Sequence, residues 1–130
     1  MAFDSKITIS GQKFDALYVS YEFERDVDQK GRPSSHVYGG KITAIVESTD
    51  STAILESMFS EHKPISGDIT FKQGNEDAEM KKLEFKEAYV TKFKEEFERK
   101  DKSPMTIAFT LTAKEISCGS ATHKEEWPEG

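Results

Sequence analysis

The chain has 130 residues, 35% of them hydrophobic and 32% charged, a length and balance that suit one globular domain and exclude the disordered class. Its 18 Lys and Arg residues against 24 Asp and Glu give a formal net charge of -6, which repels phosphate backbones and anionic lipid headgroups. We therefore expect a single domain over residues 1–130 that binds no nucleic acid and inserts into no membrane.

The first residues of the chain carry neither a basic n-region nor an apolar h-region. No apolar run approaches the roughly 18 residues that could span a bilayer. Cys118 is the only cysteine, which excludes an intrachain disulfide and is compatible with a reducing compartment. We expect a cytoplasmic protein whose export, if any, needs no signal peptide.

Most segments alternate apolar and polar residues with period two, which predicts a mainly β fold with little helix. Ile7 and Ile9 begin a first strand, and a turn at Gly11 leads into a longer one. One face of this longer strand is predicted to carry Leu17, Val19, Tyr21 and Phe23.

Residues 26–35 form a polar segment that predicts a long exposed loop, a kind of segment that often carries function. Two glycines, Gly39 and Gly40, then open the next strand, which favours a bulge or a close backbone approach, with a flexible turn as the alternative.

A short amphipathic helix is predicted after Ser48, Thr49, Asp50 and Ser51, which are all good N-caps. Its apolar face would hold Ile54, Leu55, Met58 and Phe59.

The second half of the chain reads as three strands. Ile69 and Phe71 mark the first, and residues 76–82 are predicted to form one helical turn after it. The buried face of the second is predicted to carry Leu83, Phe85, Tyr89, Phe93 and Phe97. In the third, Met105, Ile107, Phe109, Leu111 and Ala113 alternate with more polar residues.

No catalytic, cofactor-binding or metal-binding constellation is visible. His36, His62 and His123 have no second ligand at a metal spacing. The segment from Asp26 begins like a calcium loop, but Lys30 takes its fifth position and Val37 its closing Glu position. Cys118 and His123 are separated by nothing more specific than a turn. We predict that the protein is not an enzyme and needs no cofactor.

Several specific segments point to a family. They are residues 25–35, Tyr38-Gly39-Gly40, Val46-Glu47-Ser48-Thr49-Asp50, Ser66-Gly67-Asp68-Ile69, Pro104-Met105-Thr106-Ile107 and the C-terminal stretch around Trp127. Over nearly its whole length the chain resembles the tube proteins of type VI secretion systems, the haemolysin-coregulated protein family (Hcp or TssD), and in particular a short-chain subtype. Residues 94–103 are more charged than this resemblance would suggest.

The resemblance implies two packed antiparallel sheets forming a β-barrel-like domain with one short flanking α-helix. It also implies a structural subunit that forms hexameric rings, which stack into a tube and carry effectors in the lumen. The expected partners are other copies of the chain, spike and sheath components, and effectors, and the protein would leave the cytoplasm through the secretion apparatus.

Two sets of residues are candidates for assembly roles. Contact with the next ring is assigned to the polar loop, through Asp28, Lys30, Gly31, Arg32 and Pro33. A wet lumen would be lined by Thr106, Thr110, Thr112 and Lys114, with the outer surface as the alternative position. The competing function is a monomeric β-barrel that binds an apolar ligand in its interior.

Overall fold

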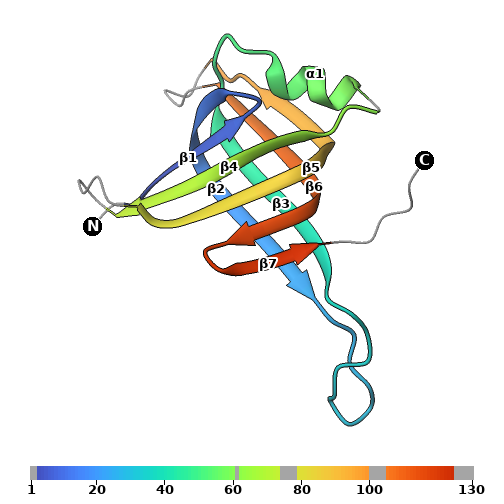
Figure 1. Cartoon of the computed structure of the whole chain (residues 1–130). Coiled ribbons are helices and arrows are strands. Elements are labelled where there is room, and N and C mark those ends of the chain that lie inside the picture. Colours follow the sequence, from blue (N-terminus) through green and yellow to red (C-terminus); the bar gives the residue numbers. More distant parts are fainter. Residues whose placement is uncertain (1–2, 61, 74–78, 100–104, 125–130) are drawn as a thin grey trace.

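The computed structural model describes residues 3–60, 62–73, 79–99 and 105–124 (Figure 1). Within them the elements, in chain order, are β1 (Phe3–Ile9), β2 (Gln12–Glu24), β3 (Tyr38–Glu47), α1 (Ala53–Phe59), β4 (Ile65–Gln73), β5 (Glu79–Glu96), β6 (Thr106–Cys118) and β7 (Ala121–Lys124). The predicted mainly β fold with one short helix is confirmed.

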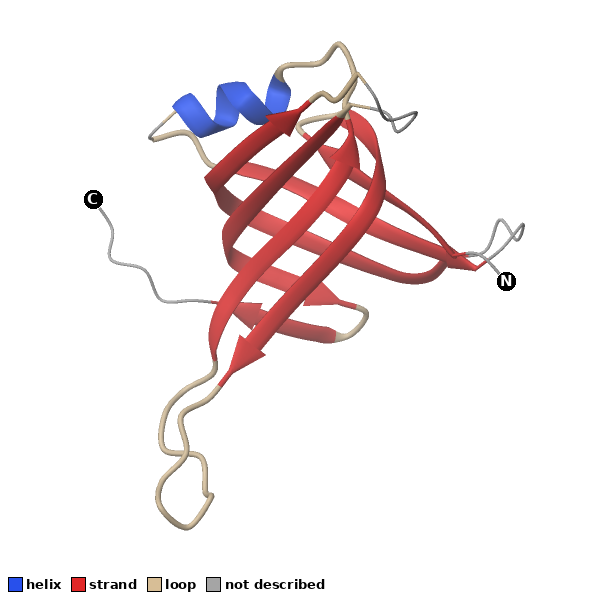
Figure 2. Cartoon of the chain, turned by 180° about the vertical axis from the view of Figure 1, so that it is seen from behind, coloured by secondary structure: helices blue, strands red, loops and turns tan. Residues whose placement is uncertain are grey.

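The strands close into an antiparallel barrel (Figure 2). Each strand pairs with the next in the order β1, β2, β3, β6, β5 and β4, and β4 returns to β1. β7 is an addition that pairs with residues 115–118 of β6, beyond the part of β6 that pairs with β3. The barrel-like domain with a flanking helix, expected from the family resemblance, is therefore the observed architecture.

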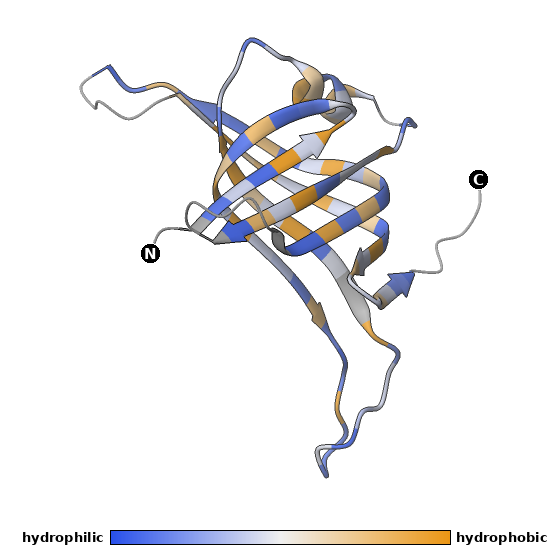
Figure 3. Ribbon diagram, turned by 60° about the vertical axis from the view of Figure 1, so that its left-hand side comes forward, coloured by the Kyte–Doolittle hydropathy of each residue, from blue (hydrophilic) through white to orange (hydrophobic). Residues whose placement is uncertain are grey.

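Alternating side chains from these strands fill the barrel, and the alternation is visible along the strands in Figure 3. The largest fully buried side chains include Phe14, Phe85, Phe109 and Leu111. In β6, the inward positions 107, 109, 111 and 113 are those that the sequence pattern predicted. Side chains from all six barrel strands thus form one core in the described part of the chain.

The β1–β2 connection is a two-residue turn, Ser10-Gly11, with φ of 50° and 83°. Two successive positive φ values are the signature of the type I′ turn, whose twist matches that of the flanking strands. Gly11 meets this requirement without strain, and the turn fixes the register in which Ile9 faces Gln12.

The predicted face of β2 is wrong at Leu17, which is 53% exposed. The pairing of β2 with β3 shifts by one residue between Ala16 and Tyr18, so Leu17 is the extra residue of a β-bulge. Beyond a bulge, the residues that point inward change from even-numbered to odd-numbered positions. Phe14 therefore packs inside before it, and Val19 packs against the core after it.

β5 departs from strict alternation in the same way. Leu83 and Phe85 are buried, but so are Ala88 and Val90, because the chain turns a corner at Glu87, where φ is 51°. Phe97, predicted to share the buried face, follows the end of the strand and is 73% exposed. The helical turn predicted for residues 76–82 is wrong from Glu79 onward, where β5 has begun, and its earlier part lies outside the described residues.

The helix is confirmed, but its first turn and its apolar face differ from the prediction. The N-cap position is Thr52, which makes no side-chain cap bond, while Ser51 Oγ accepts a hydrogen bond from the backbone N–H of Ala53 at 3.2 Å. Ile54 is buried against the barrel, whereas Phe59 at the helix end is 75% exposed.

Gly40 confirms the predicted bulge and the close backbone approach. The β2–β3 register shifts between the pairs Glu22–Lys41 and Phe23–Gly39, which leaves Gly40 as the extra residue, with φ of 67°. A Cβ at this position would lie 3.0 Å from the carbonyl oxygen of Ala113 in β6.

Candidate functional site

One half of the barrel wall is a sheet of four strands whose two outer strands are unpaired along part of their outer edges. β2, β3, β6 and β5 are neighbours in that order. Residues 16–24 of β2 pair only with β3, and residues 90–96 of β5 pair only with β6, within the described part of the chain. We name this the open-edged sheet. Its two unlike edges leave rows of backbone N–H and C=O groups without strand partners.

The outer face of the open-edged sheet carries polar residues on β6 and β3, beside an apolar row formed by Tyr18, Ile45 and Ala108. Thr106, Thr110 and Thr112 all lie on it, because the residues between them point into the core. Their cross-strand neighbours on β3 are Glu47, Thr43 and Lys41.

The remaining candidate for the lumen, Lys114, lies at the corner of the sheet. Its Nζ is 3.5 Å from a carboxylate oxygen of Glu87, so part of its charge is already balanced within the chain. Among the threonines, Thr110 is only 8% exposed and so contributes little to this surface.

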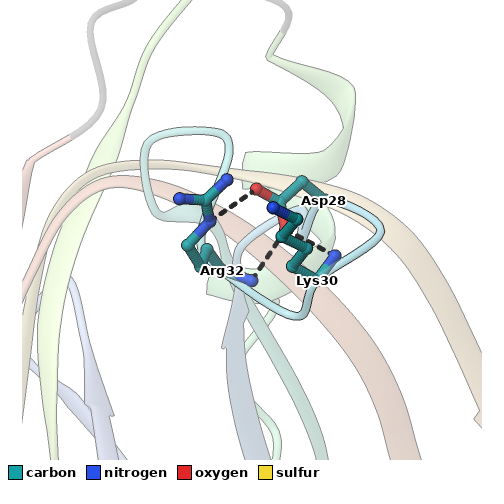
Figure 4. Close-up of polar contacts among 3 residues, drawn as sticks. All are labelled: Asp28, Lys30 and Arg32. Atoms are coloured by element: carbon teal, nitrogen blue, oxygen red, sulfur yellow. Dashed lines mark hydrogen bonds and ion pairs between the residues drawn. The ribbon is translucent and has the colours of Figure 1, made fainter.

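The polar loop projects from the end of the barrel at which β2 ends and β3 begins (Figure 1). An isolated β-bridge between Val27 and Pro33 closes its base, and the tip is organised by Asp28. Asp28 Oδ1 accepts hydrogen bonds from the backbone N–H groups of Lys30 and Arg32, both at 2.9 Å, and Oδ2 lies 3.1 Å from Arg32 Nε (Figure 4). We name these contacts the Asp28 clasp.

The Asp28 clasp engages one of the two predicted basic contact residues and leaves the side chain of the other exposed. Arg32 turns back onto Asp28, whereas Lys30 is exposed and makes no ion pair with the described residues. Gly31, with φ of 84°, completes the tight turn between them. Hydrogen bonds from Arg32 and Lys30 lower the pKa of the Asp28 carboxyl, since they stabilise its charged form.

The segment that begins like a calcium loop thus uses its second aspartate to hold its own backbone. No group of three or more His, Cys, Asp or Glu side chains that could hold a metal occurs in the described ranges. No helix among these residues is long and apolar enough to cross a membrane.

Cys118 and His123 do line one surface pocket, of about 400 Å³, at the loop end of the barrel. Its walls are largely apolar and include Tyr21, Phe23 and Ile116. The His123 ring packs edge-on against Phe23, with ring centroids 5.1 Å apart. Burial, and then the Cys118 thiol beside it, raise the pKa of the Tyr21 hydroxyl.

The opposite end of the barrel carries a larger, polar cleft of about 720 Å³ between α1, the Ser10-Gly11 turn and the start of β4. We name it the α1 cleft. Its lining includes Asp50, Thr52, Glu56, Ser57 and Lys63. The sequence analysis did not find it, because its residues come from three separate segments and share no spacing motif.

Comparisons with known proteins agree on one family. Residues 1–128 match the family model described as hemolysin coregulated protein Hcp (TssD). The structure of Hcp1 from Flavobacterium johnsoniae is 34% identical, covers 94% of this chain and 99% of its own, and superposes with a TM-score of 0.87. Hcp1 from Salmonella typhimurium, 12% identical over 95% of this chain and 92% of its own, has a TM-score of 0.73.

A more distant likeness is to a chain from the sheath–tube complex of an extracellular contractile injection system. It is 14% identical over 88% of this chain and 86% of that chain, and its TM-score of 0.51 shows a shared fold only. A search among curated proteins found no match.

Proposed function

Since the chain belongs to the Hcp (TssD) family, and is therefore a structural tube protein of type VI secretion systems rather than an enzyme, we propose that it forms closed rings which stack into a tube. Effector carriage is a property of this family. The observation that carries the ring is the open-edged sheet, because its two edges are different and can therefore meet head to tail.

A ring forms when the β5 edge of one subunit pairs with the β2 edge of the next. Strands at a free edge add a neighbour through main-chain hydrogen bonds, at a spacing of about 4.8 Å. Repeated around a rotation axis, this contact continues one sheet through all subunits and leaves no edge exposed. The family resemblance sets the expected number of subunits at six.

The outer face of the open-edged sheet then lines the lumen. Thr106, Thr112 and their neighbours on β3 supply hydroxyl and charged groups to a hydrated wall, which suits the passage of cargo. Lys114 adds a cation at the end of this wall. We propose that effectors travel along this surface.

The polar loop makes the contact along the tube axis, with Lys30 as the contacting side chain and the Asp28 clasp as its support. We propose sheath and spike components as the remaining partners. The protein is made in the cytoplasm and leaves through the secretion apparatus.

The first test is the particle mass in solution, measured by light scattering after size exclusion, with negative-stain images of the same peak. Rings of about six subunits support the proposal. A strict monomer at high concentration contradicts it and favours the ligand-binding barrel.

The second test separates ring formation from stacking. Lys30→Glu is expected to reduce tube length in the images and leave the mass of a single ring unchanged, because the polar loop that contains Lys30 projects beyond the strands of the barrel (Figure 1). Tubes as long as those of the parent protein would show that the loop does not make the axial contact.

A further inference from the structure

A largely apolar crevice of about 350 Å³ lies beside the open edge of β2. It is found where β1 and β2 separate, since their pairing stops at Lys6 and Asp15. Its walls include Ala16, Leu17 and Phe71. We name it the β1–β2 crevice. An apolar cavity of roughly 150 Å³ already holds a benzene ring, so the crevice has room for an aromatic side chain.

A buried hydroxyl group in the β1–β2 crevice lacks a partner. Ser5 lines the crevice, and its Oγ is buried without a hydrogen-bond partner among the described residues. Buried polar atoms in native structures are nearly always hydrogen-bonded. A chain segment that enters the crevice brings main-chain N–H and C=O groups, and either group completes a hydrogen bond with a hydroxyl.

The opposite edge of the open-edged sheet carries an exposed aromatic side chain. Phe97 follows the end of β5 and is 73% exposed. It comes two residues after Glu95, which faces the buried Ile107 of β6. An extension of β5 would therefore place Phe97 on the face that also carries the inward side chains of β2, among them Val19.

The two edges meet in one orientation in the proposed ring. β2, β3, β6 and β5 are each antiparallel to the next, so β5 runs opposite to β2 within one subunit. Rotation about an axis along the strands preserves these directions. The β5 edge of one subunit thus meets the β2 edge of its neighbour as an antiparallel pair, which we name the seam. Only the register of the seam is left to determine.

Charge complementarity on the outer face selects this register. Lys92 and Lys94 lie on this face of the β5 edge, and Glu22 and Glu24 lie on it at the β2 edge, because the residues between them pack against the core. All four side chains are exposed. An antiparallel pairing that places Lys94 opposite Glu22 also places Lys92 opposite Glu24. The same register aligns Phe97 with Val19, at the β1–β2 crevice.

Other registers match the charges less well. A slip of two residues in one direction places Lys94 opposite Ser20, and a slip in the other direction places Glu96 opposite Glu22. Slips of one residue exchange the two faces of the strand. Lys94 Nζ already lies 2.8 Å from a carboxylate oxygen of Glu96, whereas Lys92 makes no ion pair with the described residues.

We propose that Phe97 of one subunit inserts into the β1–β2 crevice of a second copy of this chain, in the register that pairs Lys94 with Glu22 and Lys92 with Glu24. This inference rests on the proposed ring and names the side chain that anchors its seam. The insertion covers the exposed Phe97 and Leu17 together and supplies the partner that the Ser5 hydroxyl lacks.

Substitution of Phe97 tests the insertion. Phe97→Ala should raise the protein concentration at which half of the subunits are in rings by roughly tenfold to a hundredfold, the effect of burying a phenylalanine side chain on an association constant. Thermal unfolding of the single subunit at low concentration should be unchanged, because Phe97 is exposed there. Phe97→Leu should restore most of the assembly. Phe59→Ala is the matched control, since Phe59 is 75% exposed at the end of α1, and it should leave the rings unchanged.

Two results separate the failure of the anchor from the failure of the ring. Rings of Phe97→Ala that persist to the same dilution as those of the parent protein would overturn the insertion and leave the ring standing. A parent protein that is monomeric at every concentration would overturn both.

Disulfide trapping tests the register. In a Cys118→Ser background, Lys94→Cys is combined with Glu22→Cys, and the rings are oxidised and separated under denaturing, non-reducing conditions. Directly opposed residues have Cβ atoms about 4.5–5.5 Å apart, close to the separation of a disulfide, so we expect a ladder that ends at the closed ring. Lys94→Cys with Ser20→Cys is the control and should give little product. More product from the control pair than from the test pair would overturn the register.

Discussion

Gly67 of β4 lies opposite Ile9 of β1 and in close contact with the main chain of Thr8, and we expect Gly67→Ala to be the most damaging small substitution in the barrel. A Cβ at this position would overlap the carbonyl oxygen of Thr8 and lie 2.8 Å from Cζ of Phe85, where ordinary contacts begin at 3.4 Å. Neither contacting group can move away easily, because the Thr8 oxygen belongs to the main chain of a paired strand and the Phe85 side chain is fully buried.

The expected cost follows from these two contacts. Overpacking a well-packed site costs about 1–3 kcal/mol. Separating β1 from β4 at this point also weakens main-chain hydrogen bonds, each worth about 1 kcal/mol. We therefore expect a loss of about 3–5 kcal/mol, a large share of the roughly 5–15 kcal/mol that stabilises a typical domain.

The assay is denaturant unfolding followed by circular dichroism, at one low protein concentration, so that subunit association does not add to the apparent stability. Gly119→Ala is the matched control: its Cβ meets no atom within 4 Å, and only its φ of 62° opposes the change. That control should cost about 1–2 kcal/mol. If Gly67→Ala lost no more than the control, the close β1–β4 approach would be refuted.

Three further outcomes follow from the same structure. Leu111→Ala removes a fully buried side chain and should lower the free energy of unfolding by about 2–5 kcal/mol, whereas Thr112→Ala on the outer face should change it by less than about 0.5 kcal/mol. The pKa of the Asp28 carboxyl is lowered from its ordinary value of 3.8, so the carboxylate stays charged and the clasp stays complete at and above that pH. The clasp weakens as the pH falls through the lower pKa of the folded protein, and the protection of the loop amides against exchange should be lost only in that lower pH range. Ultraviolet titration should show Tyr21 ionising above the ordinary tyrosine pKa, and Cys118→Ala should remove part of that shift while burial keeps the rest.

The strands that could be predicted from the sequence are those in which the alternation of apolar and polar residues is unbroken. β6 is the clearest example, because its inward residues from 107 to 113 keep one parity and its threonines keep the other. The loop was predicted as well, since an uninterrupted run of turn-forming and charged residues has no apolar face to bury.

The error at Leu17 comes from a bulge. Leu17 and Gly40 are extra residues that shift the parity of a strand, but only Gly40 belongs to a residue type that signals this. A leucine in an alternating run is indistinguishable from its buried neighbours until the pairing with β3 is known. The corner at Glu87 is hidden for the same reason, because a glutamate with positive φ has no signature in the sequence.

The roles of the site residues depend on contacts that spacing does not reveal. Arg32 and Lys30 look equivalent in the sequence, yet the clasp engages one and leaves the other exposed. The open edges of β2 and β5 are likewise a property of the whole topology. Each strand is unremarkable by itself, and its edge is open only because its pairing with β1 or β4 stops partway along it.

The unlike edges of β2 and β5 also determine how a defective subunit would block assembly of the proposed ring. A subunit that keeps one edge and has the other blocked still joins a growing arc, but no further subunit can add to it, so a minor fraction of such copies should prevent many rings from closing. Incomplete arcs keep one open strand edge at each end, which makes them the species most prone to misassociation. In the proposed ring, closure is therefore both the functional end point and the protection of the chain against aggregation.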